Sequence, residues 1–144
     1  NLNNIVAAFC EIGDVVFLCH PRTERRLKEY GLWDRLNACI TVLPPAGFFD
    51  MICLERNAKM ILTDSGGVQK EAYIFKVPCI TLRDSTEWSE TLEEGWNVLA
   101  GADRDAIISL AEGFQPDEGS HTELFGRGDA SARIVEIIRS TFGD

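Results

Sequence analysis

Three clusters of polar residues in this sequence are suited to binding an anion. They are His20-Pro21-Arg22, Asp64-Ser65-Gly66-Gly67 and Arg83-Asp84-Ser85-Thr86-Glu87. The planar guanidinium of an arginine can donate two parallel hydrogen bonds to a phosphate or a carboxylate. Each cluster follows a short apolar run typical of a buried strand. If these strands are parallel neighbours, the clusters lie along one edge of a sheet, where ligands of such sheets bind.

The cluster at 64–67 connects a predicted strand to a predicted helix. Gly66 and Gly67 leave no side chains where the first N–H groups of the helix point outwards, so a phosphate can approach them closely. The helix dipole favours its negative charge, and Ser65 adds a hydroxyl donor. The alternative interpretation is a plain tight turn in which Ser65 caps the helix. The pattern is neither a Walker A loop nor GxGxxG, so it indicates neither NTPase nor dinucleotide chemistry.

Three further residues each have a functional and a structural interpretation. Glu71, in the same predicted helix, can accept hydrogen bonds from ribose hydroxyls, or it is a solvated carboxylate. Arg83 binds a phosphate, or it pairs with Asp84 or Glu87. His20 is a general acid–base group or a phosphate donor, or it is structural. The sequence has no GxSxG or HExxH motif and no His/Cys cluster with metal spacing, so we expect no metal ion.

The elements that position these clusters follow from the apolar periodicity. It predicts helices at 2–12, 22–30, 48–57, 67–75, 103–113 and 130–141, and strands at 15–19, 39–43, 59–63, 78–82 and 96–100. The polar segment 83–95 is expected to be a loop with a short helix. This alternation predicts an α/β fold, namely a Rossmann-like three-layer domain with a mainly parallel sheet and helices on both faces.

Length and charge restrict the domain organisation and the partners. With 144 residues, the chain is expected to form a single domain, residues 1–144. The net charge of −9 argues against nucleic acid and against an anionic membrane surface as partners. Because Asn1 is not an initiator methionine and no signal peptide follows it, we expect a cytoplasmic chain cut from a longer protein. The five cysteines form no CxxC pair and are expected to be buried, reduced thiols.

Several of these residues together resemble one enzyme family, the non-hydrolysing UDP-N-acetylglucosamine 2-epimerases. The resemblance rests on a central stretch of motifs and on three flanking matches. The central stretch consists of Asp64-Ser65-Gly66-Gly67-Val68-Gln69-Lys70-Glu71-Ala72, Pro78, Arg83-Asp84-Ser85-Thr86-Glu87-Trp88, Glu90 and Gly95-Trp96-Asn97. The flanking matches are His20-Pro21, Leu43 to Leu54, and Gly126-Arg127-Gly128-Asp129-Ala130-Ser131. The similarity therefore covers most of the chain.

The resemblance implies a fold and a set of binding residues. The family consists of two Rossmann-like halves in the GT-B arrangement, and this chain resembles the second half, which holds UDP. Ser65, Gly66 and Gly67 are thereby assigned to the diphosphate and Glu71 to the ribose. The remaining assignments are Arg83 and Glu87 near the diphosphate, Met51 in the uracil loop, and His20 at a regulatory or cleft position.

The resemblance also implies an activity that this chain does not carry alone. The family interconverts UDP-N-acetylglucosamine and UDP-N-acetylmannosamine by eliminating UDP and re-adding it to the other face. The catalytic groups belong to the first half, so no catalytic residue and no cofactor are expected here, and the isolated chain is expected to be inactive. Its expected partners are a UDP-sugar, the N-terminal half of the same enzyme and, as an option, a second copy in a homodimer.

Two departures and two alternative functions leave the substrate open. Trp88 stands where many bacterial members have an arginine, and Met51 replaces a frequent aromatic residue. Related enzymes act on UDP-2,3-diacetamido sugars. The alternatives are the nucleotide-binding half of a GT-B glycosyltransferase and a non-catalytic UDP-sugar-binding module.

Overall fold

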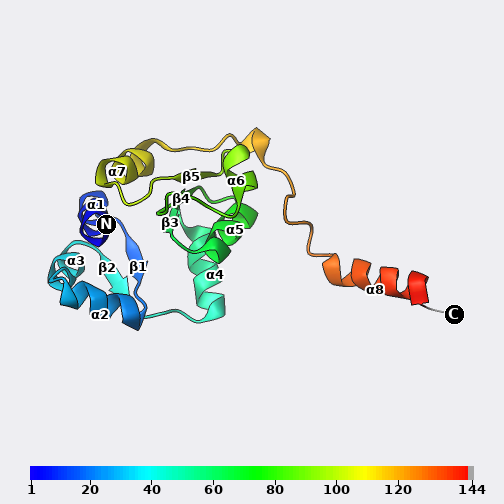
Figure 1. The fold of residues 1–144 in the computed structure, drawn as a ribbon, viewed down its shortest axis with the longest axis horizontal. Coiled ribbons are helices and arrows are strands. Elements are labelled where there is room, and N and C mark those ends of the chain that lie inside the picture. The colour runs from blue at the N-terminus through cyan, green and yellow to red at the C-terminus, as the bar shows by residue number, and fades with distance from the viewer. Residues whose placement is uncertain (143–144) are drawn as a thin grey trace.

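The computed structural model describes residues 1–142, in which helices and strands alternate as the periodicity predicts (Figure 1). The strands are β1 (Val16–Leu18), β2 (Thr41–Leu43), β3 (Ile61–Thr63), β4 (Cys79–Thr81) and β5 (Asn97–Leu99). The helices are α1 (Leu2–Ile12), α2 (Pro21–Glu29), α3 (Trp33–Cys39), α4 (Phe48–Asn57), α5 (Gly66–Phe75), α6 (Ser89–Glu93), α7 (Arg104–Gly113) and α8 (Ala130–Phe142). A short 3-10 turn, η1, covers Glu118–Ser120. The sequence did not predict α3 and η1.

All strand pairs are parallel, but the hydrogen-bonded ladder is in two parts. One part pairs β1 with β2, and the other has the order β3-β4-β5. Leu62 and Leu82 pack against the apolar cluster around Leu27 and Leu36, so side chains rather than ladder hydrogen bonds connect the two parts. The prediction of parallel strands is therefore correct, but the hydrogen-bonded ladder is interrupted between the two parts of the sheet.

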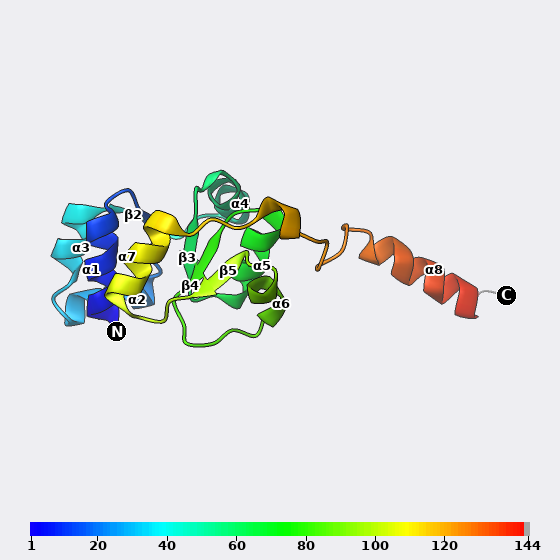
Figure 2. The ribbon, with the colours of Figure 1, turned by 90° about the horizontal axis from the view of Figure 1, so that it is seen from above.

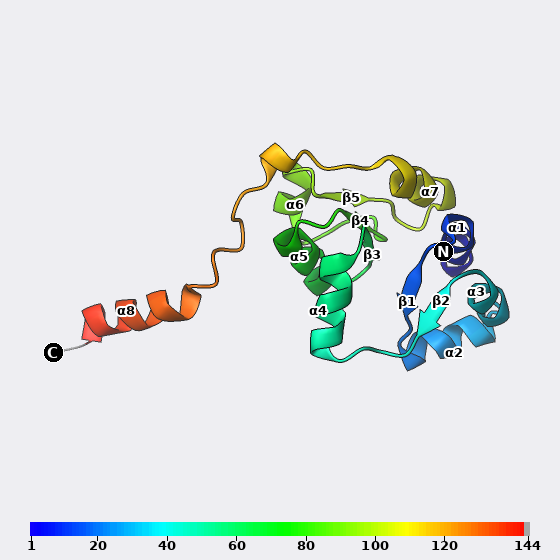
Figure 3. The ribbon, with the colours of Figure 1, turned by 180° about the vertical axis from the view of Figure 1, so that it is seen from behind.

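The two parts of the sheet differ in burial. In β4 all three residues are buried, as a central parallel strand requires. In contrast, Val16 of β1 and Leu43 of β2 are 54% and 38% exposed, so the expectation of strands buried on both faces is wrong for β1 and β2. The helices of this part, α1 to α3, lie on its outer side, away from β3 to β5, in Figures 1 and 3.

Helix α7 closes the body of the molecule by packing on α1 (Figure 2). Ala8 of α1 and Ile107 of α7 are fully buried and share one core with Ile80 of β4. This core connects the N-terminal helix to the three-stranded part of the sheet.

Helix α8 lies apart from the body in all three views, at the end of an extended segment (Figures 1 to 3). None of its residues is buried. Its large apolar side chains are exposed, namely Ile134, Val135, Ile137, Ile138 and Phe142.

The cysteines differ from the sequence expectation. Cys10 of α1 and Cys39 of α3 form a disulfide, with their Cα atoms 4.9 Å apart. Cys53 is exposed, whereas Cys19 and Cys79 are buried free thiols. The expectation of five buried, reduced thiols is therefore correct only for Cys19 and Cys79. Across residues 1–142, no helix combines the length and apolar character needed to cross a membrane.

Candidate functional site

The site is built around the N-terminus of α5, which follows β3. The Ser65 hydroxyl accepts a hydrogen bond from the backbone N–H of Val68 at 3.5 Å, so Ser65 is the N-cap. Its own backbone N–H donates to Oγ1 of Thr63 at 3.0 Å, which fixes the turn between strand and helix. Because the first N–H groups of a helix have no partner within it, those of Gly66 and Gly67 remain available to an anion.

Gly66 lies directly under the loop formed by residues 83–88. A Cβ atom at Gly66 would collide with the carboxylate of Glu87 and would lie 3.1 Å from Nε1 of Trp88. At Gly67 the nearest atom would be Oγ of Ser65, at an ordinary 3.7 Å. The absence of a side chain at Gly66 therefore lets the loop fold over the start of α5.

The loop brings one ion pair to this helix end. Nη1 of Arg83 lies 2.9 Å from Oε2 of Glu87, with both side chains more than a third exposed. The backbone N–H of Glu87 itself and then the Arg83 guanidinium hold the pKa of the Glu87 carboxyl below its usual range. An anion arriving at α5 would therefore compete with the Glu87 carboxylate for Arg83.

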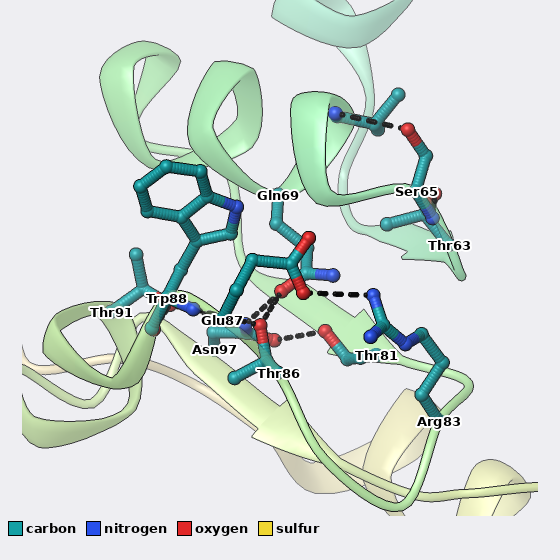
Figure 4. A network of polar contacts seen from close by, with 11 residues as sticks. Thr63, Ser65, Gln69, Thr81, Arg83, Thr86, Glu87, Trp88, Thr91 and Asn97 are labelled. Carbon is teal, nitrogen blue, oxygen red and sulfur yellow. Dashed lines mark hydrogen bonds and ion pairs between the residues drawn. The ribbon is translucent and has the colours of Figure 1, made fainter.

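A buried polar network holds the loop in place (Figure 4). Oε1 of Gln69, which is fully buried in α5, accepts hydrogen bonds from Oγ1 of Thr86 at 2.5 Å and from Nδ2 of Asn97 at 3.2 Å. Asn97 also accepts a hydrogen bond from Oγ1 of Thr81 at 2.8 Å and donates one to Oγ1 of Thr91 at 3.1 Å. The network thus joins α5, β4, β5, α6 and the loop, and it fixes the loop against the helix end.

Trp88 completes this side of the site. Its indole Nε1 is buried and has no hydrogen-bond partner among the described residues. The ammonium of Lys70 lies 4.3 Å from the centre of its ring, which is within cation–π range. Trp88 therefore has an unused N–H donor, and the positive charge of Lys70 lies over the face of its ring.

The structure brings together five of the residues predicted from the sequence, and Figure 4 shows three of them, Ser65, Arg83 and Glu87. The other two, Gly66 and Gly67, form the first turn of α5. The structural alternatives are present as well, because Ser65 caps the helix and Arg83 pairs with Glu87.

The other predicted residues lie outside this cluster. The carboxylate of Glu71 is a neighbour of Glu55 in α4. Met51 is half-buried in the first turn of α4. His20 caps α2, where its Nδ1 accepts a hydrogen bond from the Arg22 N–H at 3.2 Å, so its structural role is evident in the fold.

The sequence analysis assigned no role to Gln69, Asn97 or Glu55. Two of them carry a sequence signal, because Gln69 follows the Ser-Gly-Gly turn closely and Asn97 is a polar residue within an apolar strand. A polar residue at a core position needs hydrogen-bond partners, and these two are partners of each other. Glu55 carries no such signal, because it is one charged residue among several in its helix.

Comparison with known proteins assigns the chain to a family. A family model described as UDP-N-acetylglucosamine 2-epimerase matches residues 1–139. The chain belongs to the UDP-N-acetylglucosamine 2-epimerase family. The resemblance found in the motifs is thereby confirmed.

Two curated relatives in this family are similar over nearly the whole chain. A UDP-N-acetylglucosamine 2-epimerase homolog of Methanococcus maripaludis is 46% identical over 97% of this chain and 40% of its own length. A UDP-2,3-diacetamido-2,3-dideoxy-D-glucuronate 2-epimerase of Pseudomonas aeruginosa is 44% identical over 95% of this chain and 39% of its own length. The chain thus spans about 40% of the length of the epimerases it matches.

The fold agrees with that of solved members of the epimerase family. The Methanocaldococcus jannaschii UDP-GlcNAc 2-epimerase in complex with UDP-GlcNAc and UDP matches with a TM-score of 0.86 and 44% identity, over 96% of this chain and 40% of that chain. This match confirms the predicted α/β, Rossmann-like class as part of a GT-B chain.

Proposed function

We propose that this chain is the C-terminal, UDP-binding domain of a UDP-N-acetylglucosamine 2-epimerase, with residues 1–144 as one domain. The complete enzyme interconverts UDP-N-acetylglucosamine and UDP-N-acetylmannosamine by eliminating UDP and re-adding it to the other face of the sugar. This chain holds UDP, needs no cofactor or metal, and is inactive alone. Family membership favours this function over a glycosyltransferase half or a non-catalytic binding module.

The observation that carries the proposal is the N-terminus of α5 at Ser65-Gly66-Gly67, with the Arg83–Glu87 ion pair of the 83–88 loop beside Gly66. The first N–H groups of α5 and the Ser65 hydroxyl are donors for a diphosphate, and the helix dipole stabilises its charge. In the elimination step the bond from the sugar to UDP breaks and negative charge develops on the leaving diphosphate. Donors fixed at that position stabilise the leaving group without supplying or removing the sugar proton.

The part of the site that holds the ribose and the uracil lies on the side of α5 that faces α4. Glu71 accepts hydrogen bonds from the ribose hydroxyls, and the loop before α4, with Met51, lines the uracil. His20 belongs to a cleft or regulatory position, in addition to capping α2.

A UDP-2,3-diacetamido sugar is the second candidate substrate. The Pseudomonas aeruginosa relative named for such a substrate is 44% identical to this chain, close to the 46% of the Methanococcus maripaludis homolog. Trp88, with its free indole N–H, replaces the arginine of many bacterial members and changes the charge beside the diphosphate.

The partner of this domain is the N-terminal half of the same enzyme. The matched epimerases are about two and a half times as long as this chain, since it covers 40% of their length. The exposed apolar side chains of α8 support such a partner, because an amphipathic helix is stable when that face is buried. A homodimer that covers α8 is the alternative. The proposed compartment is the cytoplasm, where nucleotide sugars serve polysaccharide biosynthesis.

Isothermal titration of the chain with UDP and UMP tests the proposal. We expect UDP to bind more tightly than UMP, and Ser65→Ala and Glu71→Ala each to weaken UDP binding about tenfold, the loss of one hydrogen bond to a charged group. Ser109→Ala, at an exposed position of α7, is the matched control. Equal binding of UDP and UMP, or no effect of Ser65→Ala, would contradict the diphosphate assignment. Turnover of UDP-N-acetylglucosamine by this chain alone would contradict its inactivity.

A further inference from the structure

Glu55 has a buried carboxyl group to which no described residue donates a hydrogen bond. It lies in the last turns of α4 and is only 3% exposed. Neither Oε1 nor Oε2 receives a hydrogen bond from a donor among the described residues. A carboxylate in such surroundings loses its hydration without compensation, which favours the neutral acid. The C-terminal end of a helix carries partial negative charge, which acts in the same direction.

The charged neighbour of Glu55 is another carboxylate. Helix α4 packs against α5, and the Glu55 carboxyl is within hydrogen-bonding reach of Glu71 on that helix. Burial first, and then the charge of Glu71 and the hydrogen bond to it, raise the pKa of Glu55 to about 7.

The other charged groups on the elements around Glu55 point elsewhere. Lys70, the second charged residue of α5, lies over the ring of Trp88. On α4 and the turn after it, Asp50, Arg56 and Lys59 are exposed. No cation among these compensates a second negative charge beside Glu71, so nothing offsets the effect of burial on the Glu55 carboxyl.

We propose that Glu55 is a positioning residue that, as a neutral acid, donates a hydrogen bond to Glu71 and so holds this carboxylate for the ribose of a bound nucleotide. The inference rests on the proposed function, because it gives Glu71 the ribose hydroxyls as ligand. The donated bond occupies one lone pair of Glu71 and leaves the remaining ones for the hydroxyls. When Glu55 ionises, the two carboxylates repel each other, and the site gains a negative charge that also opposes an incoming diphosphate.

This arrangement makes nucleotide binding depend on pH in the neutral range. Glu55 is mostly protonated at pH 6 and mostly ionised at pH 8, given its pKa of about 7. If only the protonated form is competent, the affinity of the chain for UDP falls about tenfold between these values. Glu55→Gln is permanently neutral and keeps a donor for Glu71, so its binding should lack this fall.

The coupling between Glu55 and Glu71 is tested first, in the absence of any nucleotide. Carbon-13 NMR of the glutamate carboxyl groups in the full chain should show Glu55 titrating near pH 7, and Glu71→Gln should lower that pKa because it removes the neighbouring charge. Titration of Glu55 in the ordinary range, or an unchanged value in Glu71→Gln, would overturn the proposal whatever the chain binds.

Titration with UDP at pH 6 and pH 8 then tests the consequence. The phosphate of UDP ionises in this range as well, so the ratio of affinities in the wild type is compared with that in Glu55→Gln. Glu112→Gln, at an exposed position of α7, is the control. We expect the wild type and the control to lose about tenfold more affinity than Glu55→Gln. Equal ratios in all three would overturn the positioning role alone, whereas no UDP binding at either pH would overturn the proposed function and this inference with it.

Discussion

The side chains of Gln69 and Asn97 are joined by a hydrogen bond of 3.2 Å from Nδ2 of Asn97 to Oε1 of Gln69, at the centre of the domain. Both residues are almost completely buried. The same Gln69 oxygen binds Thr86, the residue that ties the 83–88 loop down. The position of the loop over the start of α5 therefore depends on two amides in the core.

Gln69→Ala is expected to destabilise the domain and to loosen the loop. It leaves the hydroxyl of Thr86 and one N–H of Asn97 without their acceptor, which costs about 1–3 kcal/mol of the free energy of unfolding. Because the loop carries Arg83, UDP affinity should fall as well. Chemical denaturation and isothermal titration measure the two effects. Gln115→Ala is the matched control, because Gln115 is exposed, and equal stability of the two variants would contradict the prediction.

This network also shows where sequence analysis reaches its limit. The apolar periodicity predicted the starts of α5 and α7 to within one residue, and in the structure Ser65 and Asp103 cap these starts, a feature that depends on neighbouring residues. The family motifs further identified the residues around the helix end. The partnership of Gln69 with Thr86 and Asn97 joins three distant segments, and no local pattern contains it. Helix α3 was missed because its single buried residue, Leu36, gives no apolar periodicity.

For the same reason, the burial of Glu55 and the pairing of Cys10 with Cys39 could not be predicted from the sequence. Each depends on how two helices pack, α4 on α5 and α1 on α3. The sequence shows only a charged residue on a helix and two cysteines 29 positions apart. A charged residue is more often exposed, and such cysteines are more often reduced thiols. Only the three-dimensional arrangement places their partners next to them.

Gly66→Ala and Gly67→Ala should have opposite effects on stability. Alanine favours a helix interior over glycine by about 1 kcal/mol and the first turn by less, and at Gly67 the added Cβ meets only an ordinary contact, so Gly67→Ala should stabilise slightly. At Gly66 the Cβ lies a tight 3.1 Å from the Trp88 indole nitrogen and pushes the Glu87 carboxylate away from Arg83, which should cost about 1 kcal/mol, the low end for overpacking, and outweigh the helix propensity of the first turn. Denaturant unfolding measures both variants. A stabilised Gly66→Ala would show that the loop does not rest on this position.

The Cys10–Cys39 disulfide should stabilise the α1–α3 region. It joins residues 29 positions apart, and closing a loop of this length contributes about 3.6 kcal/mol in the chain-entropy estimate. Cys39→Ser should lower the free energy of unfolding by that amount under oxidising conditions, and the difference should disappear in the presence of a reductant. Cys53→Ser, at an exposed free cysteine, is the control.

The free thiols give an independent check on this pairing. Burial raises the pKa of Cys79 to about 12 and raises that of Cys19 as well, so neither forms a thiolate readily. Labelling of the native protein with a thiol reagent should therefore modify Cys53 alone. Additional labels on Cys10 and Cys39 before any reduction would contradict the disulfide.

Tyr73→Phe should weaken the attachment of the segment that follows α7 and change the acid sensitivity of the protein. The Tyr73 hydroxyl, buried in α5, donates to the carboxylate of Glu94 or to the backbone oxygen of Thr122 and accepts a hydrogen bond from the Thr122 N–H at 3.1 Å. Its removal should cost about 1 kcal/mol. Tyr30→Phe is the matched control, because Tyr30 is 64% exposed.

The pH dependence of this variant follows from the state of Glu94. Burial acts to raise the pKa of its carboxyl, but hydrogen bonds from Thr122 and Tyr73 outweigh it and hold the pKa below the ordinary value of 4.5. A carboxyl with a lowered folded-state pKa contributes stability above its unfolded pKa, and this contribution is lost as the pH falls through the folded value. The stability difference between wild type and Tyr73→Phe should therefore be larger at pH 7 than at pH 3. Denaturant unfolding at the two pH values measures it, and an equal difference at both would show that the Tyr73 hydroxyl does not stabilise the Glu94 carboxylate.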